Sequence, residues 1–185
     1  MKAIVYKSQT GFTERYAKVL AEKTGVPAYP LKQAGKYLRK NDEIFYMGWL
    51  MAGRTSGLDS VWQKYTVRGV AIVGMSPGGN GGLWDLACKN GGFSDGGAPV
   101  FYLQGGYAPE RLKGLHKLLM KPLANSVVAE IRSKEHKATE SEVAMMNMFL
   151  HGGDCFDENK LEPIVQWFQS GIHEGKLFIL PNATL

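Results

Sequence analysis

Cysteine is scarce in this 185-residue chain, and the little there is follows no pattern. Cys88 and Cys155 form neither a disulfide framework nor the close pair that a zinc site requires. The histidines also lack carboxylate or cysteine companions at metal-ligand spacing, so we expect them at the surface. They are His116, His136, His151 and His173. These absences argue against a disulfide scaffold and a metal centre, and they favour a cytoplasmic protein with free thiols.

Long hydrophobic runs are also missing. The longest mostly apolar stretch, residues 44–53, is far shorter than the ~20 residues of a membrane-spanning helix. The first residues show none of the basic, apolar and small-residue regions of a secretory signal. Hydrophobic residues make up 44% of the chain and charged residues 21%, which is typical of a soluble globular protein. We expect one domain over residues 1–185, with a helical insertion at about 107–153.

Several nucleotide and hydrolase motifs are absent or defective. No Walker lysine follows the first loop and no G-x-G-x-x-G opens a helix, so neither ATP hydrolysis nor a Rossmann NAD site is indicated. Gly74-Met-Ser-Pro-Gly78 fits the G-x-S-x-G elbow of serine hydrolases. The residue after that serine must donate a backbone N–H to the oxyanion, and Pro77 has none. Losing one such donor costs about 2.7–4 kcal/mol of transition-state stabilisation, which disfavours a hydrolase.

What the chain does have is a hydroxyl-rich turn between its first predicted strand, residues 3–6, and its first predicted helix, residues 14–23. The turn consists of Ser8, Gln9, Thr10, Gly11, Phe12 and Thr13. A helix N-terminus offers unpaired N–H groups and a partial positive charge, and Gly11 allows close backbone approach. The turn therefore predicts a site for a terminal monophosphate. The alternative is an ordinary strand-to-helix turn capped by Thr10 or Thr13.

Strands and helices alternate along the rest of the first hundred residues. Apolar runs predict strands at residues 26–31, 43–49, 69–75 and 99–104, the first at a sheet edge because it contains Pro27 and Pro30. Helices are expected at residues 33–39, 56–65 and 83–89. Such alternation predicts an α/β fold with a parallel sheet. Further on, Thr139 and Glu142 have the spacing of a capping box, and Asp157 is expected to cap the last helix.

Ser8-x-Thr10-Gly11-x-Thr13, directly after an N-terminal strand, resembles the FMN-phosphate loop of flavodoxins. The resemblance implies a flavodoxin-like, doubly wound, five-stranded parallel sheet of order 2-1-3-4-5, with FMN where the first and third strands meet. A helical extension would follow strand five. Residues 101–107 and 115–120 are similar to the branch that includes the menaquinone-dependent protoporphyrinogen oxidases.

The resemblance also implies which residues surround the flavin. Trp49 would stack on the isoalloxazine ring, and a glycine-rich loop after the fourth predicted strand would approach the ring closely. The expected cofactor-binding residues after the phosphate loop are Trp49, Leu50, Met51, Ala52, Gly53, Ser76, Pro77, Gly78, Gly79, Asn80 and Tyr107. The alternative for Trp49 is simple packing in the core.

Positive charge is in excess, with a formal net charge of +5. Much of it lies in residues 111–137, where seven basic side chains and a leucine-rich side accompany only two acidic ones. This pattern suits an acidic redox partner protein or an anionic membrane surface, where a quinone would be found. The alternative is a solvated helix whose leucines pack on the domain. Nucleic acid is disfavoured, because aromatic side chains for base stacking are sparse in the segment.

These observations predict an FMN-binding protein that transfers electrons or acts as an oxidoreductase through the flavin. The cofactor would do the chemistry, so no catalytic side chain is expected. The alternatives are a quinone-dependent flavoenzyme similar to protoporphyrinogen oxidase and an interaction domain without flavin.

Overall fold

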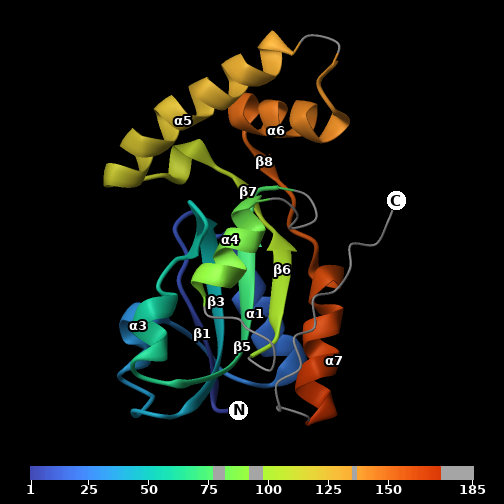
Figure 1. Ribbon diagram of the computed structural model, residues 1–185. Helices are drawn as coiled ribbons and strands as arrows, with labels where there is room; N and C mark the ends of the chain where they lie inside the picture. The colour runs from blue at the N-terminus through green and yellow to red at the C-terminus, as the bar shows by residue number, and fades with distance from the viewer. Residues whose placement is uncertain (77–81, 92–97, 135–136, 172–185) are drawn as a thin grey trace.

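A mostly parallel sheet forms the centre of the computed structural model, which describes residues 1–76, 82–91, 98–134 and 137–171 (Figure 1). Five strands are parallel and lie in the order β2-β1-β3-β5-β6. They are β1 (Ala3–Tyr6), β2 (Ala28–Pro30), β3 (Glu43–Met51), β5 (Thr66–Gly74) and β6 (Val100–Gln104). This is the order predicted for the five parallel strands. The predicted strand count is wrong, because the short strand β4 (Arg54–Thr55) pairs antiparallel with β3.

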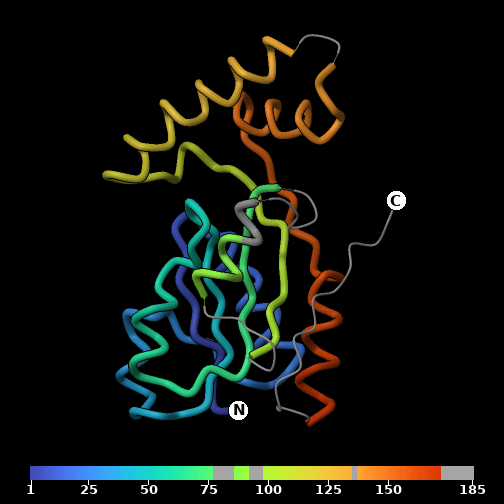
Figure 2. Tube along the Cα trace, in the orientation of Figure 1, coloured from blue at the N-terminus to red at the C-terminus, as the bar shows by residue number. Residues whose placement is uncertain are grey.

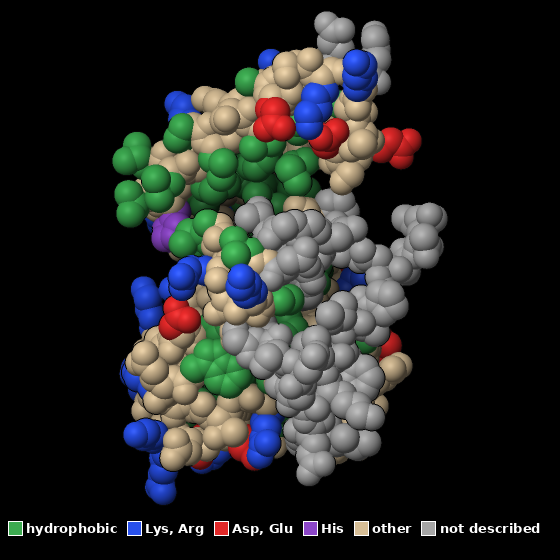
Figure 3. Space-filling view, in the orientation of Figure 1, with side chains coloured by type: hydrophobic (Ala, Val, Ile, Leu, Met, Phe, Trp, Pro, Cys, Tyr) green, Lys and Arg blue, Asp and Glu red, His purple; other side chains and the backbone are tan. Residues whose placement is uncertain are grey.

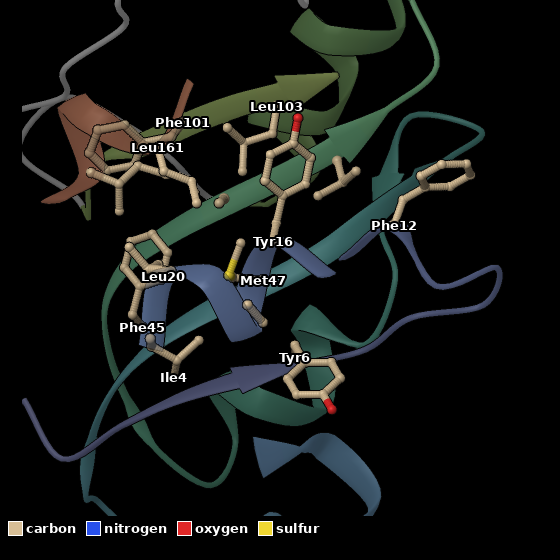
Figure 4. Close-up of a cluster of buried hydrophobic side chains, with 14 of the residues drawn as sticks. Ile4, Tyr6, Phe12, Tyr16, Leu20, Phe45, Met47, Phe101, Leu103 and Leu161 are labelled. Carbon is tan, nitrogen blue, oxygen red and sulfur yellow. The ribbon is translucent and has the colours of Figure 1, made fainter. Parts of the chain in front are cut away.

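Helices cover both faces of the sheet (Figure 1). One face carries α1 (Phe12–Thr24) and α7 (Glu162–Ser170), and the other carries α2 (Leu31–Ala34), α3 (Leu58–Trp62) and α4 (Gly82–Asn90). Neighbouring residues of a strand point to opposite faces, so Ile4 and Tyr6 enter one core while Ala3 and Val5 enter the other. Figure 4 shows the first core, where side chains of α1 meet those of β3 and β6.

The segment after the third predicted strand differs from the prediction. The predicted strand ended at residue 49, but β3 continues to Met51 and turns back into β4. The Ser56 N–H donates to the Trp49 carbonyl at 2.9 Å and closes this hairpin. Helix α3 is shorter than predicted. Leu58, Val61 and Tyr65 are buried, whereas Trp62 is 40% exposed.

An extension leaves the sheet after β6 and returns to the same place. It goes out through β7 (Gly106–Tyr107) and comes back through β8 (Gly153–Asp154), which pair antiparallel. Between them lie the 3-10 turn η2 (Pro109–Arg111) and the helices α5 (Gly114–Ser133) and α6 (Glu140–His151). Figure 2 shows the outgoing and returning segments side by side, with both helices beyond the carboxyl ends of the strands.

Local signals fix the ends of these later helices. The predicted capping box is confirmed, because Thr139 and Glu142 bond reciprocally at the start of α6. Lys134 lies 2.6 Å from Glu142, and this pairing lowers the pKa of the Glu142 carboxyl to about 2. The Asp157 side chain accepts from the Asn159 N–H and caps the turn η4 (Glu158–Leu161), which runs directly into α7.

The alternative in which the leucines of the basic segment pack on the domain is wrong, because Leu115, Leu118, Leu119 and Leu123 are all at least 50% exposed. Helix α5 instead buries Ala124, Val128 and Ile131. No helix within the described ranges has both the length and the apolarity needed to cross a bilayer.

The Tyr16 hydroxyl ties three parts of the chain together. It donates to the Gln104 carbonyl at the end of β6 (2.7 Å) and accepts from the Asp157 N–H after β8 (3.0 Å). Tyr16 is fully buried. The side chain therefore holds the returning end of the extension on both α1 and the sheet.

We predict that Tyr16→Phe lowers the free energy of unfolding by about 1–3 kcal/mol, because two partly buried backbone groups lose their partner. Tyr65→Phe is the matched control, since Tyr65 is 8% exposed and its hydroxyl forms no hydrogen bond with the described residues. We expect that control to change stability by less than about 0.5 kcal/mol. Urea unfolding monitored by circular dichroism measures both, and equal effects would contradict the assignment.

Candidate functional site

Four segments meet beyond the carboxyl ends of the parallel strands (Figure 1). They are the loop between β1 and α1, the β3–β4 hairpin, the end of β6 with β7, and the extension. In open α/β sheets, ligands bind at this edge, where the chain order reverses between neighbouring strands. Here β1 lies between β2 and β3, so the reversal falls at the β1–α1 loop and the β3–β4 hairpin.

The β1–α1 loop leaves the start of α1 open. Gly11 is the N-cap, in the left-handed region at φ 99°, and its N–H donates to the Ser8 Oγ at 3.2 Å. No side chain caps the helix, so the alternative in which Thr10 or Thr13 acts as the cap is wrong. The amides of Phe12 and Thr13 meet no acceptor among the described residues. Unpaired amides at a helix start are the groups that hold anions.

A guanidinium from the extension lies over this loop. The Arg111 Nη1 donates to the Thr10 carbonyl at 3.3 Å and lies 3.6 Å from where a Cβ on Gly11 would stand. The Arg111 Nε is also 3.3 Å from a Glu110 carboxylate oxygen. Arg111 adds positive charge to the helix dipole at a place that already favours anions. From the sequence, Arg111 belonged to the basic segment and was not among the predicted cofactor-binding residues. It lies at the candidate site because η2 is close to the carboxyl edge of the sheet.

Trp49 lies on β3 opposite Val73, close to its carboxyl end, and is contacted by the extension. The His116 ring of α5 meets the indole edge-on, with the centroids 5.3 Å apart and the planes at 69°. The Trp49 Nε1 is buried and has no acceptor among the described residues. The Thr55 Oγ1 on β4 is also buried and has no hydrogen-bond partner among them. A buried polar group without a partner costs about 1–3 kcal/mol. A ligand that offers acceptors here would remove that cost.

The residues of the β3–β4 hairpin around Trp49 have structural roles. Leu50 pairs with Thr55 and packs on the second core, while Met51 is 42% exposed and Ala52 has a positive φ of 47°. Gly48 and Gly53 are required by packing, since a Cβ would stand 2.7 Å from Thr55 Cγ2 and 2.3 Å from Leu86 Cδ2, respectively. The glycines that flank Trp49 are therefore explained without a ligand.

The remaining predicted residues divide into three groups. Pro77, Gly78, Gly79 and Asn80 lie outside the described residues. The Ser76 carbonyl accepts from the Tyr102 hydroxyl at 2.7 Å, which fixes the start of that loop. Tyr107 is 7% exposed and meets Phe149 of α6 edge-on, with centroids 5.3 Å apart. It supports the extension, and burial raises the pKa of its hydroxyl.

An apolar hollow of about 370 Å³ separates α6 from the ends of β5 and β6. Three methionines form much of its wall, with Gln104, His151 and Cys155 at its margin; they are Met75, Met145 and Met148. The Gln104 amide donates to the Met75 carbonyl at 3.0 Å, and burial raises the pKa of the Cys155 thiol. Methionine walls adapt to the shape of flat apolar molecules. Within the described ranges, no group of three potential ligands lies close enough to hold a metal ion.

Comparison with known proteins gives no relative. No family model matches the chain. No curated protein and no solved structure matches it significantly either. The function of the chain is therefore inferred from its own residues and their arrangement.

We predict that His116→Ala shifts tryptophan emission to longer wavelength and raises acrylamide quenching, because the substitution uncovers one side of the Trp49 indole. The same change in a Trp49→Phe background should leave emission unaltered, which isolates this residue among the four tryptophans. His151→Ala, on the exposed surface of α6, is the control. An equal response in both backgrounds would show that His116 acts elsewhere.

Proposed function

We propose that this chain is a flavodoxin-like protein that binds FMN and transfers electrons through it. The observation that carries the proposal is the open N-terminus of α1, with Gly11 in the left-handed region and Arg111 above it. It follows β1, at the reversal of a β2-β1-β3-β5-β6 sheet, where doubly wound folds bind ligands.

The residues present fit a terminal phosphate. Ser8, Gln9 and Thr10 form the loop before Gly11, and Phe12 and Thr13 supply first-turn amides. The hydroxyls of Thr10 and Thr13 form no hydrogen bond with the described residues, so neither acts as a helix cap. The Arg111 guanidinium balances part of the charge of a dianion. Arg111 therefore joins the sequence-predicted residues in this proposal.

The ring would lie by the β3–β4 hairpin. The orphaned Trp49 Nε1 and Thr55 Oγ1 are buried donors that a heterocycle with ring nitrogens and carbonyl oxygens could satisfy. When bound, FMN supplies the capacity to accept and release electrons. The protein's part is to hold the phosphate, exclude water from the ring and set the polarity around it. Tyr107 is not proposed as a ring contact, because it packs on Phe149.

A second candidate is an oxidoreductase with its own small acceptor, such as a quinone. The methionine-lined hollow supports it, since it offers an apolar space at the ends of β5 and β6, and β5 pairs with the strand that carries Trp49. The first candidate needs a redox partner protein instead. Steady-state turnover with a water-soluble quinone and NAD(P)H distinguishes the two, because a pure carrier shows no saturable quinone turnover.

The absorbance spectrum of the purified protein tests the proposal directly. Bands of oxidised flavin, released by denaturation and identified as FMN by chromatography, would support it. A colourless protein that does not take up added FMN is an interaction domain without flavin, and that result would overturn the proposal.

The phosphate loop gives a quantitative prediction. Thr10→Ala should weaken FMN binding at least about tenfold, because a hydrogen bond to a charged group contributes about 1.5–3 kcal/mol. Riboflavin lacks the phosphate, so its affinity should be lower in the wild type and unchanged by the substitution. Fluorescence titration with both ligands measures this. Equal wild-type affinity for FMN and riboflavin would mean that the loop holds no phosphate.

Arg111 provides a second prediction. Arg111→Gln should weaken FMN binding by about tenfold or more and leave riboflavin binding unchanged, because only the phosphate interacts with the lost charge. Lys113→Gln removes the same charge two residues away, where no contact with the loop is formed by the described residues. We expect that control to change the FMN affinity less than about threefold, because salt screens the long-range attraction between the Lys113 charge and the phosphate. If Arg111→Gln weakened the binding of FMN and riboflavin equally, Arg111 would instead act by holding the extension in place.

A further inference from the structure

Two tyrosines stack on each other at the edge of the sheet opposite β6, where β2 is the last strand. The rings of Tyr29 and Tyr37 are nearly parallel, with their planes at 8° and their centroids 4.3 Å apart. Tyr29 packs against the second core, whereas Tyr37 is 55% exposed. Because Tyr29 covers one face of the Tyr37 ring, the exposed area of Tyr37 lies mainly on the other face.

The backbone fixes the position of Tyr37. Its N–H donates to the Ala34 carbonyl at 3.0 Å, and the Leu38 N–H donates to the same carbonyl at 2.9 Å. Ala34 and Leu38 are both buried in the second core, so the turn that follows α2 is anchored on either side of Tyr37. An exposed ring held in this way loses little conformational freedom when it binds a ligand.

Positive charge accompanies the stacked rings. From residue 23 to residue 41 the chain contains five basic residues and no acidic one. Lys36 directly precedes Tyr37, Lys40 follows it by three residues, and Lys32 lies on α2. These three lysines are exposed and form no ion pair with the described residues. Figure 3 shows Lys and Arg side chains at the lower left of the molecule, on the side of the sheet away from α7. We call Tyr29, Tyr37 and the three lysines the tyrosine surface.

We infer that the tyrosine surface binds single-stranded nucleic acid. An unpaired base can extend the stack on the open face of Tyr37, while the long side chains of Lys36 and Lys40 reach the phosphates on either side of it. Charge alone would suit any polyanion, and the open aromatic face among the charges is what favours a chain of bases. The sequence argument against nucleic acid concerned residues 111–137, where aromatic side chains are sparse, and this surface lies elsewhere. The inference is independent of flavin binding.

The test is fluorescence anisotropy with two labelled probes of equal length and phosphate charge, an oligothymidylate and the corresponding abasic chain. Wild-type protein should bind the oligothymidylate at least about fivefold more tightly at low salt, because only this probe can stack. Tyr37→Ala should remove that preference and leave the affinity for the abasic chain within about twofold. Tyr37→Phe retains an aromatic face, so it should bind both probes within about twofold of wild type.

The lysines are tested with the same probes. Lys36→Gln with Lys40→Gln should weaken the binding of both at least about fivefold and reduce the dependence on salt, because phosphate contacts are lost. The matched control is Lys117→Gln with Lys121→Gln, which removes the same charge from exposed positions on α5. It should keep both affinities within about twofold. Thermal melting verifies that every variant is folded, and all the substituted side chains are exposed.

Three results would overturn the inference. Wild-type protein that binds neither probe has no such site. Equal wild-type affinity for the two probes, or a preference that Tyr37→Ala retains, would mean that no base stacks on this ring. Equal losses in the two lysine pairs would show general adsorption of a basic protein to a polyanion.

Discussion

The parallel pairing of β1 with β3 is the contact on which the rest of the structure depends. β1 has only four residues, and all of them are buried between β2 and β3. Alternate side chains of this strand begin the two cores, so one register error would exchange every side chain between the faces. The same pairing places the β1–α1 loop beside the β3–β4 hairpin. The geometry of the candidate site therefore depends on the pairing of the short strand β1 with β3.

The extension is tied to this site at two points rather than resting on it loosely. Arg111 reaches the Thr10 carbonyl, and His116 meets the edge of Trp49. Both residues come from the first turns after the outgoing strand β7, so the contacts lie close to where the chain leaves the sheet. A ligand in the loop would touch groups from both the sheet and the extension. Occupancy of the site and the position of the extension are then linked through the same side chains.

The sequence predicted most of what depends on local chemistry. Apolar runs identified the parallel strands, and the Thr139–Glu142 spacing identified the capping box, because each signal is contained within a few residues. The order of the strands came from the resemblance to flavodoxins and not from any local signal. The two-residue strand β4 was missed, since so short a pairing leaves no periodicity. The role of Arg111 was missed because it depends on the path of a chain a hundred residues away from the loop it meets.

The exposed leucines show a different limit of sequence reasoning. Helical spacing predicts that a stripe of leucines exists, but it does not say whether the stripe faces the protein. Helix α5 has two apolar sides, and the smaller residues, such as Ala124 and Val128, are the ones buried. Larger side chains in the first half extend beyond the reach of α6. Where one helix has two apolar sides, tertiary packing alone decides which of them becomes buried.

The pairing of β7 with β8 makes the helical extension separable from the sheet. Because they are antiparallel neighbours, the residues where the extension departs and returns are already adjacent, and a tight turn could join them. The Tyr16 bonds that hold this junction come from the sheet layer and need no residue of α5 or α6. A chain in which a tight turn joined β7 directly to β8 would keep the same sheet and the same Tyr16 bonds. The helices α5 and α6 therefore form a unit that can be shortened or exchanged without a change in the strand order beneath it.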